Sequence, residues 1–204
     1  ANGGILFFDE LPHFAPQILE SLREPLEDYK INISRVNSKI TYETKFMFVA
    51  AMNPCPCGNL LSKNLECKCS ELEIKRYKSR ISAPVLDRID LHVQMDEVSA
   101  DDKSDVTSES MQDTVLRVFE MQISRTQSEL NGKLSDEEIA KFCVCDDEAS
   151  RALDHATQRF SLSRRAINKT LKVARTVADI EGSCIIKKPH ILEALSYRVK
   201  QEGA

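Results

Sequence analysis

The chain has 204 residues, of which 42% are hydrophobic and 29% are charged, so it can form one large folded domain or two small ones. Its formal net charge is −4, and any binding to nucleic acid must therefore come from a local basic patch and not from the overall charge. No apolar run approaches the length of a membrane span and no signal-peptide pattern occurs, so we expect a cytoplasmic protein without a membrane partner.

A continuous apolar run near the beginning of the chain, Ile5–Phe8, leads directly into the carboxylates Asp9 and Glu10. Such a run favours a central strand of a parallel sheet, covered on both faces, and open α/β sheets bind their ligands at the carboxyl ends of these strands. There Asp9 can hold Mg²⁺ beside the phosphates of a nucleotide, and Glu10 can orient and polarise the attacking water. The stretch is interpreted as a Walker B motif, against the alternative of a buried strand that ends in two solvated acids.

We expect the chain to be a fragment of a longer protein. The apolar strand begins at residue 4, and a central parallel strand needs neighbours that normally come from both sides in sequence. No Gly-x-x-x-x-Gly-Lys-Ser/Thr phosphate loop occurs in the sequence. Without that loop, the chain alone is expected to bind nucleotide weakly at best and to hydrolyse ATP negligibly.

A helix and a hairpin are predicted next. Residues 15–27 have apolar positions at helical spacing, and Pro25 is expected to end or kink this helix near its last turn. Residues 30–36 and 39–42 alternate apolar with polar positions on either side of a turn at Asn37-Ser38, which predicts a β-hairpin.

A second apolar run, residues 45–53, predicts another buried strand that ends at Asn53. If the two apolar strands are parallel neighbours, Asn53 lies beside the acidic end of the first one. A cysteine-bearing loop over residues 55–69 follows, and the charged segment 71–80 is compatible with a short helix. A short strand is predicted at residues 91–95.

The acidic, serine-rich stretch 99–110 is predicted to be a linker, and the pattern after it is helical. Ser135 and Glu138 form a capping box at the start of one of the helices. Arg175 is interpreted as a surface or interface residue of the bundle without a chemical role. The predicted fold class is α/β followed by α, with a truncated α/β layer and then a five-helix bundle. Helices are expected over residues 111–130, 135–142, 148–160, 163–180 and 189–199.

Seven cysteines in a chain without a secretory signal predict thiols or metal ligands and no disulfide framework. Four of them form two Cys-x-Cys pairs, and four thiolates can close a tetrahedral, structural Zn²⁺ site that leaves no open position for a substrate. Zinc ribbons usually use Cys-x-x-Cys, so reduced surface thiols are the alternative. The candidate ligands are Cys55, Cys57, Cys67 and Cys69.

Four features of the sequence together suit a ring-shaped nucleotide hydrolase. They are the acidic strand end, Asn53, Arg88 and the pair Arg164-Arg165. Such an enzyme needs a polar side chain that holds water near the γ-phosphate. It also needs one arginine that reaches the γ-phosphate of a neighbouring subunit and another that senses nucleotide from a mobile lid. Taken singly, Asn53 before a proline is also explained as a turn former, and Arg88 between two aspartates as a surface ion pair.

Four blocks of sequence carry a resemblance to a known family. They are Gly-Ile-Leu-Phe-Phe-Asp-Glu-Leu-Pro (4–12), Phe-Val-Ala-Ala-Met-Asn-Pro-Cys-Pro-Cys-Gly (48–58), Arg-Tyr-Lys-Ser-Arg-Ile-Ser-Ala-Pro-Val-Leu-Asp-Arg-Ile-Asp-Leu-His-Val (76–93) and Lys-Val-Ala-Arg-Thr-Val-Ala-Asp-Ile-Glu-Gly (172–182). In this order they resemble the AAA+ ATPases of the magnesium-chelatase-like clade, and more narrowly the ComM (YifB-type) proteins. The resemblance covers nearly the whole chain, and Asn-Pro-Cys-Pro-Cys-Gly is its most specific part.

The resemblance implies roles for the polar residues of the α/β part. Asp9 and Glu10 match the Walker B pair, in which Asp9 holds the Mg²⁺ of Mg-ATP and Glu10 activates water. Asn53 matches sensor 1, which positions that water. Arg88 matches the arginine finger, which acts in trans on the ATP of a neighbouring subunit.

The resemblance also implies roles for basic residues elsewhere. Arg165 matches the sensor 2 arginine, which binds nucleotide, through the Ser-x-Arg pattern that begins at Ser163, while Arg164 stays open as the alternative. The hairpin resembles the pre-sensor-1 hairpin, which points into the pore of the ring in helicase members of the clade. Arg35 and Lys39 flank its turn and are candidates for contacts with the phosphate backbone of DNA.

The domain organisation implied by the resemblance has three parts. Residues 1–98 are the carboxyl-terminal half of an AAA+ α/β core, residues 99–110 are a linker, and residues 111–204 are the helical lid. The implied function is ATP hydrolysis by a hexameric ring that moves branched or single-stranded DNA, as in branch migration during recombination or natural transformation. Two alternatives are open: a magnesium-chelatase motor subunit, against which the cysteine block argues, and a non-catalytic, zinc-stapled DNA-binding module.

Overall fold

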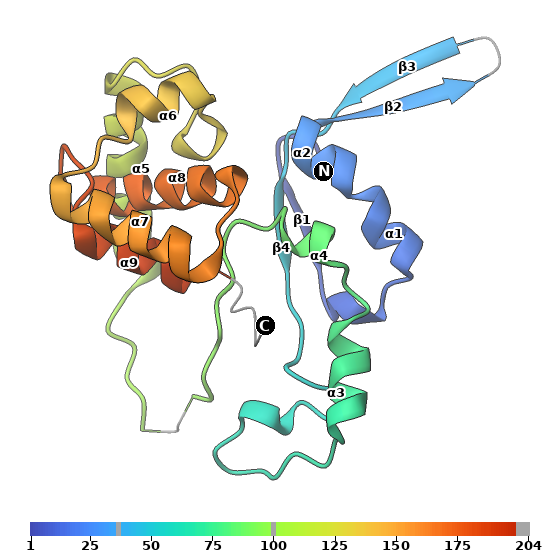
Figure 1. Ribbon diagram of the computed structural model, residues 1–204. Helices are drawn as coiled ribbons and strands as arrows, with labels where there is room; N and C mark the ends of the chain where they lie inside the picture. Colours follow the sequence, from blue (N-terminus) through green and yellow to red (C-terminus); the bar gives the residue numbers. More distant parts are fainter. Residues whose placement is uncertain (36–37, 99–100, 199–204) are drawn as a thin grey trace. The chain divides into compact units, whose positions relative to one another are not determined.

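The computed structural model of the protein describes residues 1–35, 38–98 and 101–198, apart from the side chains of Arg35 and Ser38. The chain forms two compact units (Figure 1). The first holds residues 1–89 and 94–99, and the second holds residues 90–93 and 100–204. The first unit contains both strands and helices, whereas the second unit is helical.

Two parallel strands, β1 (Ile5–Phe8) and β4 (Met47–Ala50), form the sheet of the first unit, with Phe8 opposite Ala50. The predicted apolar strands are therefore parallel neighbours, and their carboxyl ends lie at one edge of the sheet.

The prediction that these strands are covered on both faces is wrong within the described residues. Leu6, Phe8, Phe48 and Ala50 pack against a core that includes Leu11, Leu19, Leu22, Ile81 and Val85. On the opposite face, the exposed fractions are 64% for Ile5, 57% for Phe7, 62% for Met47 and 38% for Val49. Successive side chains of a strand point to opposite faces, so this alternation shows that the described residues cover only one of them.

The helices of the first unit are short. The predicted helix over residues 15–27 is broken in two at Leu22, because Pro25 has no N–H to donate to the carbonyl of Ser21. The break therefore falls one turn earlier than expected, and the second piece continues through Asp28. The helical elements are η1 (Leu11–His13), α1 (Pro16–Ser21), α2 (Arg23–Asp28), η2 (Asn59–Leu61), α3 (Glu71–Lys78) and α4 (Ala83–Leu86).

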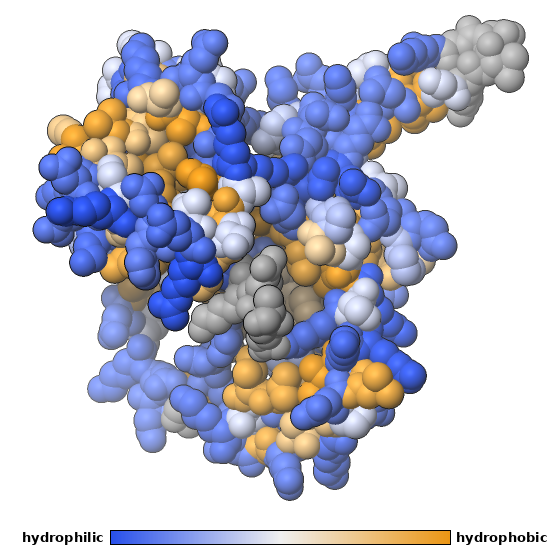
Figure 2. All heavy atoms as spheres, viewed as in Figure 1, coloured by the Kyte–Doolittle hydropathy of each residue, from blue (hydrophilic) through white to orange (hydrophobic). Residues whose placement is uncertain are grey.

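The predicted hairpin is confirmed as β2 (Lys30–Arg35) paired with β3 (Ser38–Glu43), and it extends away from the β1–β4 pair (Figure 1). Of the predicted turn pair, Asn37 lies outside the described residues, as does Val36, whereas Ser38 is the first residue of β3 and pairs with Arg35. On one face of the hairpin, Ile31 is opposite Tyr42 and Ile33 is opposite Ile40. Apolar surface is visible along the hairpin in Figure 2.

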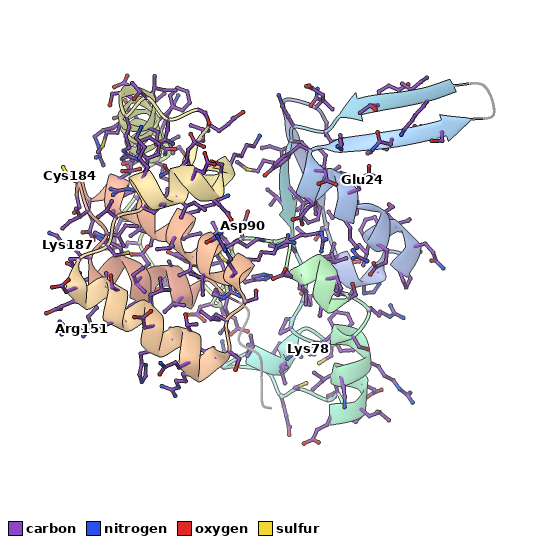
Figure 3. All side chains as sticks on the ribbon, turned by 45° about the horizontal axis from the view of Figure 1, so that its top comes forward. Glu24, Lys78, Asp90, Arg151, Cys184 and Lys187 are labelled. Carbon is purple, nitrogen blue, oxygen red and sulfur yellow. The ribbon has the colours of Figure 1, made fainter. Side chains whose placement is uncertain are left out.

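The polar face of the hairpin is anchored to α2. The Asn32 amide donates to Glu24 Oε1 at 2.6 Å, and the Thr41 hydroxyl donates to Asn32 Oδ1 at 2.8 Å. Glu24 is on α2, close to the base of the hairpin (Figure 3). The base of the hairpin is thus held by side-chain hydrogen bonds, while its far end is stabilised within the described residues by the strand ladder.

Five α-helices form in the described part of the second unit, as the periodicity predicts. The first of them covers residues 108–124 and not 111–130, so it begins inside the predicted linker and ends six residues earlier than expected. Ser135 caps α6 and forms the predicted capping box with Glu138, and Ser163 is the N-cap of α8. The predicted strand at 91–95 is not formed. This segment is irregular and is held by the His92 N–H, which donates to the Tyr197 carbonyl at 2.7 Å. The helical elements are α5 (Ser108–Ser124), η3 (Asn131–Lys133), α6 (Asp136–Phe142), α7 (Asp147–Phe160), α8 (Arg164–Ile180) and α9 (Lys188–Ser196).

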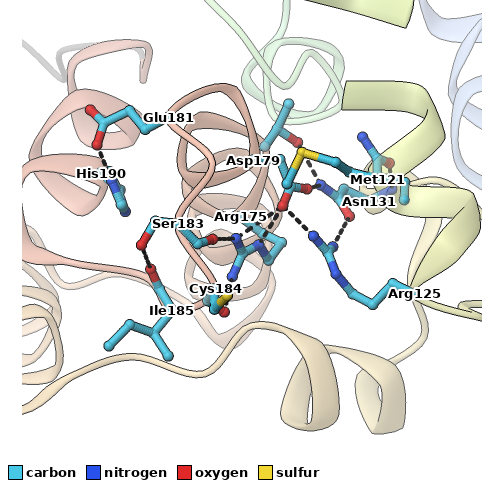
Figure 4. A network of polar contacts seen from close by, with 12 residues as sticks. Met121, Arg125, Asn131, Arg175, Asp179, Glu181, Ser183, Cys184, Ile185 and His190 are labelled. Atoms are coloured by element: carbon cyan, nitrogen blue, oxygen red, sulfur yellow. Dashed lines mark hydrogen bonds and ion pairs between the residues drawn. The ribbon is translucent and has the colours of Figure 1, made fainter. Parts of the chain in front are cut away.

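A buried charged network lies inside the second unit (Figure 4). Arg175 and Asp179 have side chains that are 1% and 0% exposed, and Arg175 Nη2 donates to Asp179 Oδ1 at 2.9 Å. Arg125 also pairs with Asp179, and the Asn131 amide donates to its Oδ2 at 2.8 Å. The interpretation of Arg175 as a surface or interface residue is therefore wrong, because its side chain is buried with Asp179, whose other partners, Arg125 and Asn131, come from segments that are distant in sequence.

The same network satisfies the carboxyl end of α8. Gly182 has φ 71°, and the Ser183 N–H donates to the Ala178 carbonyl at 2.8 Å, which together form a Schellman turn. The turn directs the carbonyls of Ser183 and Cys184 back to the Arg175 guanidinium, which donates to both. Arg175 thus stabilises a helix end as well as a buried carboxylate.

Replacing Asp179 with Ala is expected to lower the free energy of unfolding by about 3–5 kcal/mol, because Arg175 is left as a buried charge without its carboxylate. Urea denaturation followed by circular dichroism measures this change. Asp154 is exposed on α7, and Asp154→Ala is the matched control, expected within about 0.5 kcal/mol of the unmodified protein. A loss below about 1 kcal/mol for Asp179→Ala would contradict the assignment of the network as a stabilising element.

Candidate functional site

The acidic pair lies where β1 ends. Glu10 has φ 50° and ψ 49°, a left-handed conformation that is uncommon for a residue with a side chain. Such a conformation costs about 1–3 kcal/mol and persists where the surrounding contacts impose it. Here the Leu11 N–H donates to the Ala51 carbonyl at 3.0 Å, which turns Leu11 into the core and leaves Asp9 and Glu10 exposed.

Asn53 lies at the same edge of the sheet, three residues after the end of β4. The Ala51 N–H continues the ladder to the Phe8 carbonyl at 2.9 Å, so β4 extends beside the beginning of the acidic pair. Asp9, Glu10 and Asn53 therefore follow the carboxyl ends of two paired strands at one edge of the sheet, although the two segments are more than 40 residues apart in the sequence. Their roles toward a nucleotide stay predictions.

The four cysteines of the loop form a compact cluster of sulfur atoms. The Sγ–Sγ distances are 3.4 Å for Cys55–Cys57, 3.7 Å for Cys55–Cys67 and 3.6 Å for Cys57–Cys67. All four sulfurs, including that of Cys69, lie within 4.8 Å of one another. A tetrahedral zinc site with Zn–S bonds of about 2.3 Å places its sulfurs about 3.8 Å apart. The cluster therefore has the spacing of four ligands of one metal ion such as zinc.

The chain on either side of the cluster is built from turns and caps. Gly58 has φ 83°, and its N–H donates to the Cys55 carbonyl at 3.1 Å, so the chain reverses between the first two cysteines and η2. After the last cysteine, Ser70 forms a capping box with Glu73 and starts α3.

The loop between the cysteine pairs lacks an apolar core. Leu61 and Leu65 are 50% and 61% exposed, and apolar side chains are visible on the surface of this part of the first unit (Figure 2). Cys55, in contrast, is 0% exposed. The position of the loop therefore depends on its sulfur cluster and its turns, and burial of leucines contributes little.

The electrostatics of the cluster differ from one sulfur to the next. Hydrogen bonds from the backbone N–H groups of Asn59 and Lys68 lower the pKa of the Cys57 thiol to about 6. Burial, followed by the neighbouring Cys57 sulfur, raises the pKa of the Cys69 thiol to about 12. The environment thus favours the thiolate form of Cys57, while burial and the neighbouring sulfur atoms disfavour ionisation of Cys69.

Tyr77 on α3 is a residue of this site that the sequence analysis missed. It is 6% exposed, and burial is the main influence that raises the pKa of its hydroxyl. A hydrogen bond from the backbone of Asn53 lowers this pKa, while the charges of Glu10 and Cys55 raise it. Tyr77 thus lies close to the acidic pair, to Asn53 and to the cysteine cluster. The apolar spacing of Ile74, Tyr77 and Ile81, within an otherwise charged segment, was the signal in the sequence.

Arg88 follows α4 and is tied to the α1–α2 segment of its own unit. Its Nε lies 3.3 Å from Glu27 Oε2, and Nη1 donates to the Pro84 carbonyl at 2.6 Å. The side chain is only 15% exposed. The ion pair with Glu27 spans about 60 positions of sequence and was not expected from the flanking aspartates. The role of Arg88 as an arginine finger stays a prediction.

Arg164 and Arg165 occupy the first turn of α8 in the second unit. Arg164 is 84% exposed and pairs with Asp136 Oδ2 at 3.3 Å, whereas Arg165 is half-buried. The choice between them as the sensor 2 arginine stays open. For the predicted DNA contacts, Lys39 is exposed and opposite Ser34 on the polar face of the hairpin, and the side chain of Arg35 lies outside the described residues.

Comparison with known proteins identifies a family that matches most of the chain. The family described as "Magnesium chelatase, subunit ChlI" matches residues 1–103, and its C-terminal counterpart matches residues 105–198. Within the described ranges, no helix combines the length and the apolar character that crossing a bilayer requires.

Similar curated proteins come from several bacteria. The chain is 40% identical over 203 residues to the competence protein ComM of Haemophilus influenzae, covering 97% of this chain and 39% of that protein. It is 40% identical to the uncharacterized protein YifB of Escherichia coli and 39% identical to YifB of Salmonella typhimurium, with 97% of this chain and 40% of each relative covered. The chain thus spans about two fifths of the length of these relatives. On these matches, the chain belongs to the magnesium chelatase ChlI family and is of the ComM/YifB type.

Proposed function

We propose that the full-length protein is an ATP-hydrolysing AAA+ motor that acts on branched or single-stranded DNA as a hexameric ring. The observation that carries this proposal is the convergence of Asp9, Glu10 and Asn53 at one sheet edge in a member of this family. The left-handed backbone of Glu10 adds support, since strained residues of this kind concentrate at functional sites. A relative of 40% identity is named a competence protein, which fits a role in the processing of incoming DNA.

In this proposal the residues of the first unit form an incomplete site. Asp9 holds the Mg²⁺ of Mg-ATP, Glu10 activates water and Asn53 positions that water. Arg88 completes the site of a neighbouring subunit, and Arg165 couples movement of the helical lid to the nucleotide state. The phosphate loop would be supplied outside these 204 residues, so the chain alone is expected to be inactive. Residues 1–98 act as the second half of the α/β core, residues 99–110 as a linker and residues 111–204 as the lid.

The hairpin is the proposed DNA contact. Lys39, with Arg35, would bind the phosphate backbone, which gives affinity that falls steeply with salt and little dependence on base sequence.

A structural Zn²⁺ ion at the four cysteines is the second part of the proposal. Four protein ligands close the coordination shell, so the ion would hold the loop and would not take part in the chemistry. The same cluster also fits a non-catalytic, zinc-stapled DNA-binding module, which would bind DNA without nucleotide and without turnover. A magnesium-chelatase motor subunit would instead support insertion of Mg²⁺ into protoporphyrin.

Glu10→Gln in the full-length protein is expected to lower ATP turnover by at least about 100-fold, because the amide cannot act as general base. Turnover is measured with and without branched DNA. Glu148 is exposed on α7, and Glu148→Gln is the matched control, expected to leave turnover unchanged. Full activity in Glu10→Gln would assign water activation to another residue, and no turnover in the unmodified protein would favour the DNA-binding module.

The role of Arg88 in trans predicts recovery when two inactive variants are mixed. Glu10→Gln and Arg88→Ala are each expected to abolish turnover. In rings of randomly mixed subunits, roughly a quarter of the interfaces combine an intact Glu10 with an intact Arg88 from the neighbour, so about a quarter of the turnover returns. An arginine that acts only within its own subunit would give no recovery on mixing.

One Zn²⁺ per chain is expected in the purified protein, measured by elemental analysis. Cys57→Ser removes a ligand and is expected to abolish stoichiometric zinc. Cys184 is exposed in the connection between α8 and α9 (Figure 3), and Cys184→Ser is expected to keep the metal. Zinc that survives Cys57→Ser would show that the cluster is not the metal site.

A further inference from the structure

Helix α5 carries apolar side chains on both its inner and its outer face, and the described residues pack only against the inner one. On this inner face, Val118 and Gln122 are 6% and 7% exposed, and the Gln122 side chain accepts a hydrogen bond from the Asn131 N–H at 2.8 Å. Arg117 donates to the Ile180 carbonyl at 2.9 Å. These contacts hold α5 against η3 and α8, so the outer face has a fixed orientation within the second unit.

The outer face of α5 is a continuous apolar stripe. Its four residues follow one another at intervals of four positions, which places them along one side of the helix. The exposed fractions are 56% for Met111, 66% for Val115, 46% for Phe119 and 59% for Ile123. At a rise of about 1.5 Å per residue the stripe is about 18 Å long, which matches about three turns of a second helix.

A pocket continues the stripe at its carboxyl end. The pocket has a volume of about 150 Å³, and Phe119, Ile123 and Leu130 line it together with polar residues between positions 122 and 129. A cavity of this size holds a benzene-sized group. The pocket can therefore receive one large apolar side chain of a partner, the kind of anchor that a helix places in a groove.

The border of the stripe is acidic. Glu109, Asp113 and Glu120 are exposed and follow helical spacing along one edge of α5. Glu129 lines the pocket. Arg117 is the one cationic residue in the sequence of α5. A matching partner therefore carries lysine or arginine side chains beside its apolar residues.

These features argue against other occupants of the stripe. The backbone groups inside a helix are already paired, so an added β-strand finds no hydrogen-bonding partners there. The acidic border repels anionic lipid and nucleic acid. A second copy of α5 offers three carboxylates and one cation, so it does not complement this border. A basic amphipathic helix matches both the apolar stripe and its charge.

We propose that the outer face of α5 is a docking surface for a basic amphipathic helix of another protein, which places one large apolar side chain in the pocket beside Phe119. The inference goes beyond the proposed motor function and does not rest on it, because no residue of this surface has a role toward nucleotide or DNA. Failure of one therefore leaves the other as it stands.

Binding of two designed peptides to the full-length protein tests the proposal, measured by fluorescence anisotropy. Both peptides are helices of about four turns with leucine along one face, and the remaining positions carry lysine in one peptide and glutamate in the other. The lysine peptide is expected to bind at least about tenfold more tightly than the glutamate peptide, with an affinity that falls as salt is raised.

Two pairs of variants assign this binding to α5. Phe119→Ser is expected to weaken binding of the lysine peptide at least about tenfold, because it removes the aromatic wall of the pocket. Leu192→Ser is its control, expected within about twofold of the unmodified protein, since Leu192 is 52% exposed on α9. Glu120→Lys is expected to weaken binding of the lysine peptide and strengthen that of the glutamate peptide. Glu148→Lys changes the net charge equally on α7 and is expected to do neither.

Three results would overturn the inference. Equal affinity of the unmodified protein and Phe119→Ser for the lysine peptide would place its binding elsewhere. Absence of binding, with Phe119 protected from hydroxyl-radical labelling in the free protein, would show that another segment of the full-length chain covers the stripe. Protection of Phe119 that increases with protein concentration would show that a second copy covers it. Circular dichroism of each variant checks that the fold is retained.

Discussion

The parallel pairing of β1 with β4 is the interaction on which the rest of the first unit depends. Its register, with Phe8 opposite Ala50, brings the residues after both strands to one edge of the sheet. A shift of one residue would turn Phe8 and Phe48 out of the core and move the acidic pair away from Asn53. The same pairing supplies the hydrogen bond from Leu11 to Ala51 that holds Glu10 in its left-handed conformation.

The cysteine loop follows β4 at this edge of the sheet, and its structure depends little on hydrophobic burial. Its leucines are half exposed, while its four sulfurs converge at the spacing of metal ligands. The loop also leads into α3, on which the side chain of Tyr77 is buried. A loop of this kind can be long and polar and still position a residue accurately, provided that a cross-link closes it.

The second unit buries charged side chains within a helical bundle. Arg175 and Asp179 lie one turn apart on α8, and isolated on a surface they would form a weak pair. In the bundle they are almost completely buried, and Arg125, Asn131 and the carbonyls after Gly182 complete their hydrogen bonds. The network connects α5, η3 and the end of α8, so it determines how these segments pack.

The sequence by itself determined the elements whose signals are local. The apolar runs predicted β1 and β4, the alternation predicted the hairpin, and Ser135 with Glu138 predicted the start of α6, because period and caps act within a few residues. The Cys-x-Cys pairs predicted the candidate metal ligands, although spacing could not show that the two pairs meet. Only the tertiary structure decided that the described residues leave one face of the β1–β4 sheet exposed, that residues 91–95 form no strand, and that Arg175 and Tyr77 are buried. These outcomes depend on how the segments pack in three dimensions, which the local sequence pattern does not specify.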